Sequence, residues 1–383
     1  MKQSGIKKKR NQTKRRKKVA SSIEAIAESE PDAAQRKPTE SNLLSTGSTL
    51  LNLALTDNPH GGFLKGKYYF MVGDSSSGKT FLSMTCFAEA TQNPNFKDYR
   101  LIYDNVEDGC LMDIERLFGK EAARRIESPA GTKKNPEYSY TIEDFYYNLD
   151  DILDNGKPFI YVLDSMDSLS SEYEGKKFNE QKTAYRKGAK TEGSYGDGKA
   201  KKNSENIRKI LARLGKQGSI LIILCQTRDD LSFGYSKKTR SGGRALKFYA
   251  TVEIWSSIEA TITKTVKGQL RKIGISSKLE TKKNRITGKL KTVSVPIYPS
   301  YGMDDIGSCV DYLIMEGYWK KSKKNKGFRC PEVRIEGPRE KIIAGIEARG
   351  LEHILKETVG KCWREIESLC DLKRKNKYDS KIN

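Results

Sequence analysis

With 383 residues, of which 36% are hydrophobic and 31% are charged, the chain is long enough for one large α/β core with solvated extensions. No stretch approaches the roughly 18 uninterrupted apolar residues of a membrane-spanning helix, and the basic N-terminus lacks the apolar stretch of a secretory signal. The seven cysteines are scattered and odd in number, without a C-x-x-C pair, and only two histidines accompany them. This pattern disfavours a disulfide framework and a zinc site, and it predicts reduced thiols in a cytoplasmic protein.

The formal net charge of +22 is concentrated in two clusters. Residues 1–20 contain ten Lys or Arg and no acid, and residues 264–291 contain ten more against the single acid Glu280. No amphipathic apolar face accompanies either cluster. Such clusters predict a polyanionic partner, nucleic acid rather than a membrane.

The hydrophobic pattern divides the chain into three parts. Residues 1–43 are polar with little to bury, so we expect a disordered basic arm, which is a solvated extension, a targeting sequence or a DNA attachment. Residues 44–300 alternate apolar runs with helical stretches, which predicts an α/β core with a central, mostly parallel sheet. For residues 301–383 the pattern predicts a small helical region with a basic tail. The predicted strands are 67–73, 100–105, 158–165, 219–226 and 251–257, with further β-like stretches at 278–283 and 292–298; the predicted helices are 79–90, 110–118, 142–154, 205–216, 306–316, 339–349 and 351–370.

Two long polar interruptions break this alternation, at residues 170–202 and 228–244. Loops of this length inside a compact domain are usually functional or disordered.

A complete G-x-x-x-x-G-K-[ST] motif follows the apolar strand that ends at Val72 and precedes a predicted helix. Its glycines let the backbone wrap a phosphate, and the N–H groups at a helix start favour the anion. We expect Lys79 to reach the β- and γ-phosphates of ATP and the Thr80 hydroxyl to ligate Mg²⁺. The predicted nucleotide-binding residues are Gly73, Asp74, Ser75, Ser76, Ser77, Gly78, Lys79 and Thr80.

Two further strands end in acidic residues. The run Phe159–Val162 leads to Leu163 and Asp164, the form of a strand whose final carboxylate holds the water shell of Mg²⁺. Asp104 and Glu107 follow another strand, at the end where open α/β sheets bind ligands. Glu107 is the candidate base that polarises the attacking water, and Asp104 is the alternative.

Several segments resemble bacterial RecA, in the same order along residues 44–320. The segments are 45–55, which leads into the phosphate loop, and 162–169 around Asp164. Gln226 follows the fourth strand, and residues 242–250 (G-G-R-A-L-K-F-Y-A) are close to the RecA sequence G-G-N-A-L-K-F-Y-A. Residues 282–285 (K-K-N-R) resemble a further RecA element. The resemblance departs by one extra residue between Asp104 and Glu107, which leaves the choice of base open.

The resemblance implies a RecA-like P-loop NTPase core and a role for further residues. Gln226 would sense the γ-phosphate, and Lys283 and Arg285 would reach the nucleotide of a neighbouring protomer, as an arginine finger does. Segments 170–202 and 228–244 would be the two DNA-binding loops. The predicted DNA-binding residues are Arg228, Phe233, Lys237, Lys238, Arg240, Gly242, Gly243 and Arg244.

The resulting expectation is a DNA-dependent ATPase that uses ATP and Mg²⁺, forms a helical filament on single-stranded DNA, and promotes homologous pairing and strand exchange in recombination and repair. Double-stranded DNA would join during pairing, and the protein would act in the cytoplasm of a bacterium or a phage-infected cell. Two alternatives stay open: a helicase or translocase on the same core, and a DNA-binding or annealing protein with a weak or idle ATPase.

Overall fold

A computed structural model describes residues 38–188, 198–230, 237–240, 243–323 and 326–374. The expected arm at residues 1–43 lies almost wholly outside these ranges, and residues from Glu40 onward belong to one compact unit. None of the helices in the described ranges is long and apolar enough to cross a membrane.

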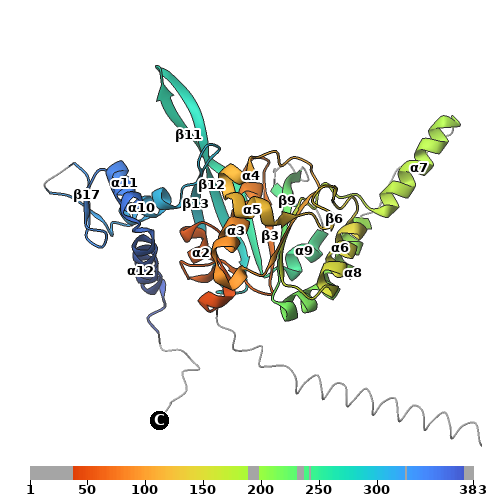
Figure 1. The fold of residues 1–383 in the computed structure, drawn as a ribbon, viewed down its shortest axis with the longest axis horizontal. Helices are drawn as coiled ribbons and strands as arrows, with labels where there is room; N and C mark the ends of the chain where they lie inside the picture. The colour runs from red at the N-terminus through yellow and green to blue at the C-terminus, as the bar shows by residue number, and fades with distance from the viewer. Residues whose placement is uncertain (1–37, 189–197, 231–236, 241–242, 324–325, 375–383) are drawn as a thin grey trace, which may run out of the picture. The chain divides into compact units, whose positions relative to one another are not determined.

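A ten-stranded sheet forms the centre of this unit (Figure 1). Its order is β14-β13-β12-β11-β3-β9-β8-β4-β5, and β10 pairs with β9. The contacts from β11 through β3, β9, β8 and β4 to β5 are parallel, and the others are antiparallel. This arrangement confirms the predicted α/β class with a mostly parallel, RecA-like core. The strands are β3 (Tyr68–Gly73), β4 (Arg100–Asn105), β5 (Ile126–Glu127), β8 (Phe159–Asp164), β9 (Ile220–Asp230), β10 (Lys237–Arg240), β11 (Val252–Val266), β12 (Gln269–Asn284), β13 (Thr292–Tyr298) and β14 (Gly302–Met303).

Helices cover both faces of the sheet, because its central strands carry apolar side chains on both sides. Along β3, Tyr69 and Met71 enter one core, and Tyr68, Phe70 and Val72 enter the other. The first core includes α2 (Thr49–Thr56), α3 (Lys79–Gln92), α4 (Ile114–Phe118), α5 (Lys120–Arg125), α10 (Asp305–Met315), α11 (Arg339–Arg349) and α12 (Glu352–Cys370). The second includes α6 (Ile142–Asp154), α8 (Gly198–Gln217) and α9 (Gly243–Tyr249).

Several short elements lie around these two cores. They are 3₁₀ turns at Glu40–Asn42 and Pro94–Phe96, and the two-stranded pairs β1 (Leu43–Leu44) with β2 (Phe63–Leu64) and β6 (Ala130–Gly131) with β7 (Pro136–Glu137).

The polar composition of segment 170–202 predicted a continuous loop, and this prediction was wrong. It contains α7 (Glu172–Arg186), which begins with a capping box in which the Ser171 hydroxyl accepts from the Glu174 N–H at 3.2 Å. Helix α8 starts at Gly198, earlier than predicted. The prediction failed because α7 buries none of its side chains and so has no hydrophobic period for a sequence pattern to detect.

The segment 228–244 was also wrongly predicted to be a loop throughout. Strand β9 continues to Asp230 and pairs with β10 in antiparallel register, with Thr227 opposite Arg240. Strand β11 likewise runs to Val266 rather than residue 257, and β12 starts at Gln269 rather than residue 278. Most residues in the β11 and β12 extensions are exposed, and their apolar residues are isolated, so the extensions lack the apolar runs on which the prediction rested. Helix α4 is shorter than the predicted 110–118, because Asp113 caps it and accepts from the Arg116 N–H.

The C-terminal region is not purely helical. It also holds a three-stranded antiparallel sheet of β15 (Lys320–Lys321), β16 (Phe328–Cys330) and β17 (Ile335–Gly337). Helix α12 packs against the core near α2, where Trp363 Nε1 donates to Asp57 Oδ1 at 3.1 Å and Lys289 pairs with Glu367 at 2.9 Å. All seven cysteines are free, and five of them are buried.

Candidate functional site

The phosphate-binding motif forms the turn between β3 and α3, at the carboxyl edge of the parallel sheet. Gly78 has φ of +94°, and a Cβ there would lie 2.6 Å from Ile297 Cδ1, so only glycine fits. Gly73 is equally confined, because its Cβ would lie 2.4 Å from the Ser256 carbonyl oxygen. The loop therefore offers its backbone N–H groups and the start of α3 to an anion.

Two serines from the neighbouring hairpin fix the shape of this loop. Ser256 on β11 and Ser277 on β12 both donate to the carbonyl oxygen of Ser77, at 2.9 and 2.7 Å. Their hydroxyls are buried, which strengthens the bonds by excluding water. Neither residue could be identified from the sequence, because their roles depend on the pairing of β11 with β3 and with β12.

Lys79 and Thr80 point into the site from the first turn of α3. The Lys79 amine donates to the carbonyl oxygens of Gly73 and Asp74 at 2.9 and 2.7 Å, so it curls over its own loop. Burial lowers the pKa of Lys79, while Asp164 and Glu107 oppose that shift. An anionic ligand in the loop would offer this amine a better partner than two neutral carbonyls.

Asp164 lies at the end of β8 and shares one carboxylate oxygen between two hydroxyls. Thr80 Oγ1 donates to Asp164 Oδ2 at 2.7 Å, and Tyr103 OH on β4 donates to the same oxygen at 2.9 Å. Burial raises the pKa of Asp164, and both hydrogen bonds counteract the shift. A hydroxyl and a carboxylate that converge beside a phosphate loop are oxygen donors of the kind that Mg²⁺ prefers. These residues therefore fit a magnesium–nucleotide complex, although the described residues contain no cluster of three or more His, Cys, Asp or Glu that could hold a metal by itself.

Glu107 faces the same edge and accepts hydrogen bonds through Oε1. Ser165 donates a very short bond to that oxygen, Gln226 Nε2 donates at 3.1 Å, and Ser168 Oγ lies at 3.3 Å. The Gln226 backbone N–H is held in turn by Asp167 Oδ2 at 2.5 Å. Gln226 is the strand partner of Gly73 and Asp164 is the partner of Asn105, so strand register alone brings the four strand ends together.

The Asp104 side chain points into the protein interior rather than toward the phosphate loop. Its side chain is fully buried and accepts from Tyr161 OH at 2.6 Å, Ser139 Oγ at 2.7 Å and the Ser139 N–H at 3.0 Å. Burial raises the pKa of Asp104, and these hydrogen bonds oppose the shift. The carboxylate thus ties the segment before α6 to β8.

Lys283 and Arg285 lie at the other end of the sheet. Lys283 pairs with Glu253, which pairs with Phe70, whereas the phosphate loop begins at Gly73, three residues and roughly 10 Å further along. The Lys283 amine donates to the Lys247 and Phe248 carbonyls at 2.7 Å each, and Arg285 Nη2 donates to the Phe248 carbonyl at 3.0 Å. The structure therefore does not bring these two residues to the phosphate loop of their own chain.

The predicted DNA-binding residues fall on β9, β10 and the start of α9. Phe233 and Gly242 lie outside the described residues, and for Arg228, Lys237, Lys238 and Arg240 only the strand backbone is described. Gly243 has φ of +80° where α9 begins, and Arg244 is exposed. The segment that begins at Arg228 directly follows Gln226 and Thr227 in strand β9. Thr227 Oγ1 donates a hydrogen bond to Asp74 of the phosphate loop.

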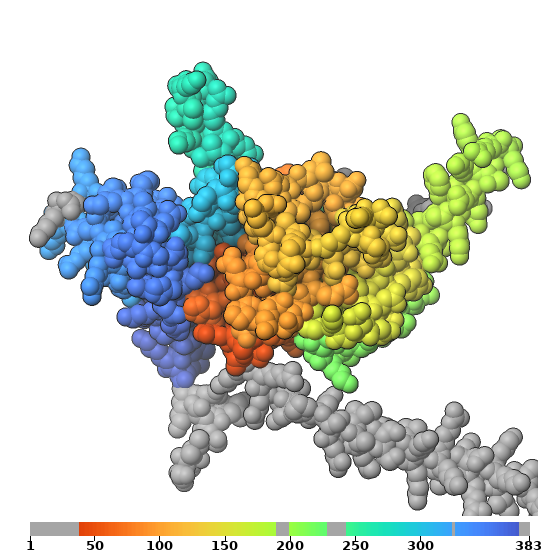
Figure 2. Space-filling model, in the orientation of Figure 1, coloured from red at the N-terminus to blue at the C-terminus, as the bar shows by residue number. Residues whose placement is uncertain are grey.

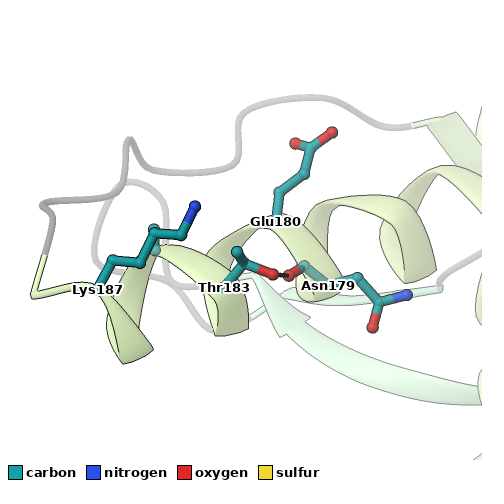
Figure 3. A pocket seen from close by; sticks show the side chains of 5 residues that line it. Asn179, Glu180, Thr183 and Lys187 are labelled. Atoms are coloured by element: carbon teal, nitrogen blue, oxygen red, sulfur yellow. Dashed lines mark hydrogen bonds between the residues drawn. The ribbon is translucent and has the colours of Figure 1, made fainter.

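Helix α7 presents two different faces to solvent. Phe178 and Tyr185, seven residues apart and so on one face, are 64% and 84% exposed, with Lys182 between them. The other face lines an open hollow with Asn179, Glu180, Thr183, Ala184 and Lys187, where Thr183 Oγ1 donates to the Asn179 carbonyl at 2.8 Å (Figure 3). The base of α7 follows Ser165 and Ser168, the hydroxyls that hold Glu107, by only a few residues.

Together, the sheet order, the phosphate loop on a central strand and the acidic strand ends define a P-loop protein with a RecA-like α/β core. Residues 183–304 match the RecA N-terminal domain family. The chain is 27% identical over 287 residues to Protein RecA of Chlorobaculum tepidum, an alignment that covers 73% of this chain and 72% of the relative. It is also 27% identical over 291 residues to Protein RecA of Prochlorococcus marinus, covering 72% and 68%. These matches support a member of the RecA family.

Proposed function

We propose that the protein is an ATP-dependent recombinase that assembles as a helical filament on single-stranded DNA and promotes homologous pairing and strand exchange in recombination and repair. The observation that carries this proposal is the hydrogen bond from Gln226 to Glu107. It links the candidate hydrolytic base to the strand that continues directly into the candidate DNA-binding segment. Free cysteines throughout the chain support a reducing cytoplasm, bacterial or phage-infected, as its compartment.

ATP would lie in the loop Gly73–Thr80, with Lys79 moving from the loop carbonyls to the β- and γ-phosphates. Thr80 and Asp164 would hold Mg²⁺, which neutralises charge on the phosphate oxygens when bound. Glu107, rather than the buried Asp104, would orient the attacking water and accept its proton. The water oxygen bonds to the γ-phosphorus as the bond to the ADP oxygen breaks, which yields ADP and phosphate.

DNA contact is assigned to the two segments that follow β8 and β9. Basic residues at Arg228, Lys237, Lys238, Arg240 and Arg244 suit the phosphates, Gly242 and Gly243 allow close backbone approach, and Phe233 would wedge between bases. Because both segments begin within a few residues of the groups that hold Glu107, the presence of a γ-phosphate and the binding of DNA would be energetically coupled.

The position of Lys283 and Arg285 favours a head-to-tail assembly. They cannot serve the nucleotide of their own chain, but in a heterologous interface they would reach the nucleotide of the next protomer. Such an interface builds a helix when the rotation does not close. ATP in the interface would favour the assembled state, and hydrolysis would release it.

The decisive experiment is electron microscopy with single-stranded DNA and a non-hydrolysable ATP analogue, alongside ATPase rates with and without DNA. Helical filaments and DNA-stimulated hydrolysis are expected, and Lys79→Ala should abolish strand exchange. Closed rings would favour a helicase or translocase on this core. Filaments or DNA annealing without stimulated hydrolysis would instead indicate an idle nucleotide site.

A further inference from the structure

Asp74 of the phosphate loop and Thr227 of β9 follow two neighbouring parallel strands. Strands β3 and β9 pair in register as far as Gly73 and Gln226, and the two residues come immediately after this last pair. The Thr227 hydroxyl donates to Asp74 Oδ1 directly beyond the paired residues. Figure 2 shows α7 and the β11–β12 hairpin projecting from the body of the protein, whereas this contact joins two central strands of the sheet.

Thr227 also belongs to the base of the candidate DNA-binding segment. It lies opposite Arg240 in the antiparallel pair of β9 and β10. A displacement of Thr227 would therefore be passed to both strands, because backbone hydrogen bonds join them. The neighbouring Gln226 N–H is held by Asp167 Oδ2 at 2.5 Å, which fixes the point at which β9 leaves the phosphate loop.

Asp74 is anchored in the phosphate loop through its own carbonyl oxygen. That oxygen accepts from Ser77 Oγ and from the Lys79 amine, both at 2.7 Å. The carboxylate is the part of Asp74 that reaches β9, and both Asp74 and Thr227 are half-buried. Partial exclusion of water strengthens a hydrogen bond to a charged group. The contact therefore connects the phosphate loop directly to the candidate DNA-binding segment.

The carboxylate of Asp74 is not needed to wrap a phosphate, since the motif accepts any residue at this position. It instead places a negative charge beside a site for an anion. Burial lowers the pKa of Lys79, and Asp74 is among the acids that oppose this shift, so its charge acts on the amine that would bind the phosphates. Phosphates in the loop would repel the carboxylate, which makes a hydroxyl donor on Asp74 more favourable. Occupancy of the loop should thus strengthen the bond to Thr227.

We propose that Thr227 is a positioning residue that, through Asp74, transmits occupancy of the phosphate loop to the candidate DNA-binding segment. The inference rests on the proposed function for its nucleotide and DNA ligands. The bond from Gln226 acts on the candidate hydrolytic base, whereas Thr227 contacts the loop that would hold the nucleotide itself. Coupling between two sites is reciprocal, so DNA that fixes this segment would raise the affinity for nucleotide by the same factor.

The test uses Thr227→Val, which removes the hydroxyl and keeps a β-branched side chain suited to a strand. Thr227→Ser restores the donor. Thr91→Val is the matched control, because the half-buried Thr91 donates to the Ala88 carbonyl within α3 at 2.7 Å. The affinity for a labelled single strand of DNA is measured with and without a saturating non-hydrolysable ATP analogue, and the ratio of the two affinities is the enhancement factor.

Thr227→Val should lower the enhancement factor at least about fivefold, the lower end of typical coupling between sites. Thr227→Ser and Thr91→Val should stay within about twofold of the unaltered protein, and so should the DNA-free ATPase rate of Thr227→Val at saturating ATP. In an Asp74→Ala background, Thr227→Val should have no further effect, because the acceptor is already absent. Where the analogue enhances DNA binding by the unaltered protein, an unchanged factor in Thr227→Val would overturn the proposal. An equal loss in Thr227→Ser, or a further loss in the double variant, would do the same.

A second measurement needs no DNA. Hydrogen–deuterium exchange of the backbone amides of β10 and of β9 beyond Thr227 should slow at least about fivefold when the analogue binds to the unaltered protein, but not in Thr227→Val. Absence of this protection in the unaltered protein would overturn the link. Protection that depends on Thr227, found while the analogue leaves DNA affinity unchanged, would support the link and contradict the proposed recombinase.

Discussion

Gln226 and Glu107, 119 positions apart in the chain, are joined by a hydrogen bond of 3.1 Å from the Gln226 amide to Glu107 Oε1. Strands β4, β8 and β9 are parallel neighbours, so the residues that follow their apolar runs meet at the carboxyl edge of the sheet. The amide is the only one of the three groups contacting that oxygen that comes from β9, because Ser165 and Ser168 both follow β8. We therefore expect Gln226 to be one group through which the candidate DNA-binding segment acts on hydrolysis.

Removing the Gln226 amide should uncouple ATP hydrolysis from DNA binding. We expect Gln226→Ala to reduce the DNA-stimulated ATPase rate at least about tenfold, as loss of a group that orients a catalytic residue typically does, while nucleotide affinity stays within about twofold. Ser168→Ala removes a longer contact to the same oxygen and should have little effect. Full stimulation in Gln226→Ala would contradict the coupling.

Glu107 and Asp104 should differ in what they control. Glu107→Gln should lower the ATPase rate by about 10²- to 10⁴-fold without weakening nucleotide binding, because it removes only the proton acceptor. Asp104→Asn should act on stability, since an amide group would face the donors Tyr161 and Ser139; we expect about 1–3 kcal/mol of destabilisation. Thermal unfolding and ATPase rates of both variants test this, and a stable but inactive Asp104→Asn protein would reverse the assignment.

Tyr103 should act through Asp164. Its hydroxyl holds the oxygen that Thr80 also contacts, so Tyr103→Phe should loosen the carboxylate and raise the Mg²⁺ concentration needed for nucleotide binding by roughly tenfold. Binding of a fluorescent nucleotide with excess chelator should be unaffected. Tyr161→Phe is the matched control, because that hydroxyl donates to Asp104 instead. Equal Mg²⁺ dependence in the two variants would show that Tyr103 has no positioning role.

The exposed aromatic face of α7 should contribute stacking to single-stranded DNA binding. Each base stacked on an aromatic side chain is worth about 1–3 kcal/mol, so Phe178→Ala/Tyr185→Ala should weaken binding at least about tenfold. The loss should be absent on an abasic strand, which keeps the phosphates but lacks the bases. Tyr147→Ala, which removes an exposed aromatic from α6, is the control. A similar loss on the abasic strand would indicate a change in charge contacts or folding rather than stacking.

The pKa of Lys283 should lie near 8, below that of an ordinary lysine. Burial, with Arg285 as a like-charged neighbour, lowers its pKa from 10.5 to about 8. Between these two values the unfolded chain binds the extra proton, so the contribution of Lys283 to stability increases as pH rises through this range. If Lys283 contacts a neighbouring nucleotide, assembly should weaken as pH passes about 8, since the neutral amine no longer attracts phosphate.

Amine acylation followed by mass spectrometry measures this titration directly. Half-maximal labelling of Lys283 is expected near pH 8 in the absence of nucleotide. Arg285→Ala should shift that midpoint upward, because it removes the repelling charge. A midpoint near the ordinary lysine pKa of about 10.4 would contradict the prediction.

The sequence by itself determined the class of this protein. The phosphate motif is contiguous, and a fully apolar strand such as Tyr68–Gly73 is visible as a run, so the parallel core and its family could be predicted from local patterns. The same holds for Asp164 and Gln226, each of which directly follows an apolar run.

Only the tertiary structure decided which residues meet. Strand order and register brought Tyr103 to Asp164, directed Asp104 into the interior, and separated Lys283 from the phosphate loop of its own chain. It also revealed α7, which buries none of its side chains, and the continuation of β11 and β12 beyond their pairing with β3 and β13, where isolated apolar residues alternate with exposed polar ones. A local pattern records which side chains are buried, whereas long-range pairing decides which hydroxyl, amide and carboxylate come within hydrogen-bonding distance.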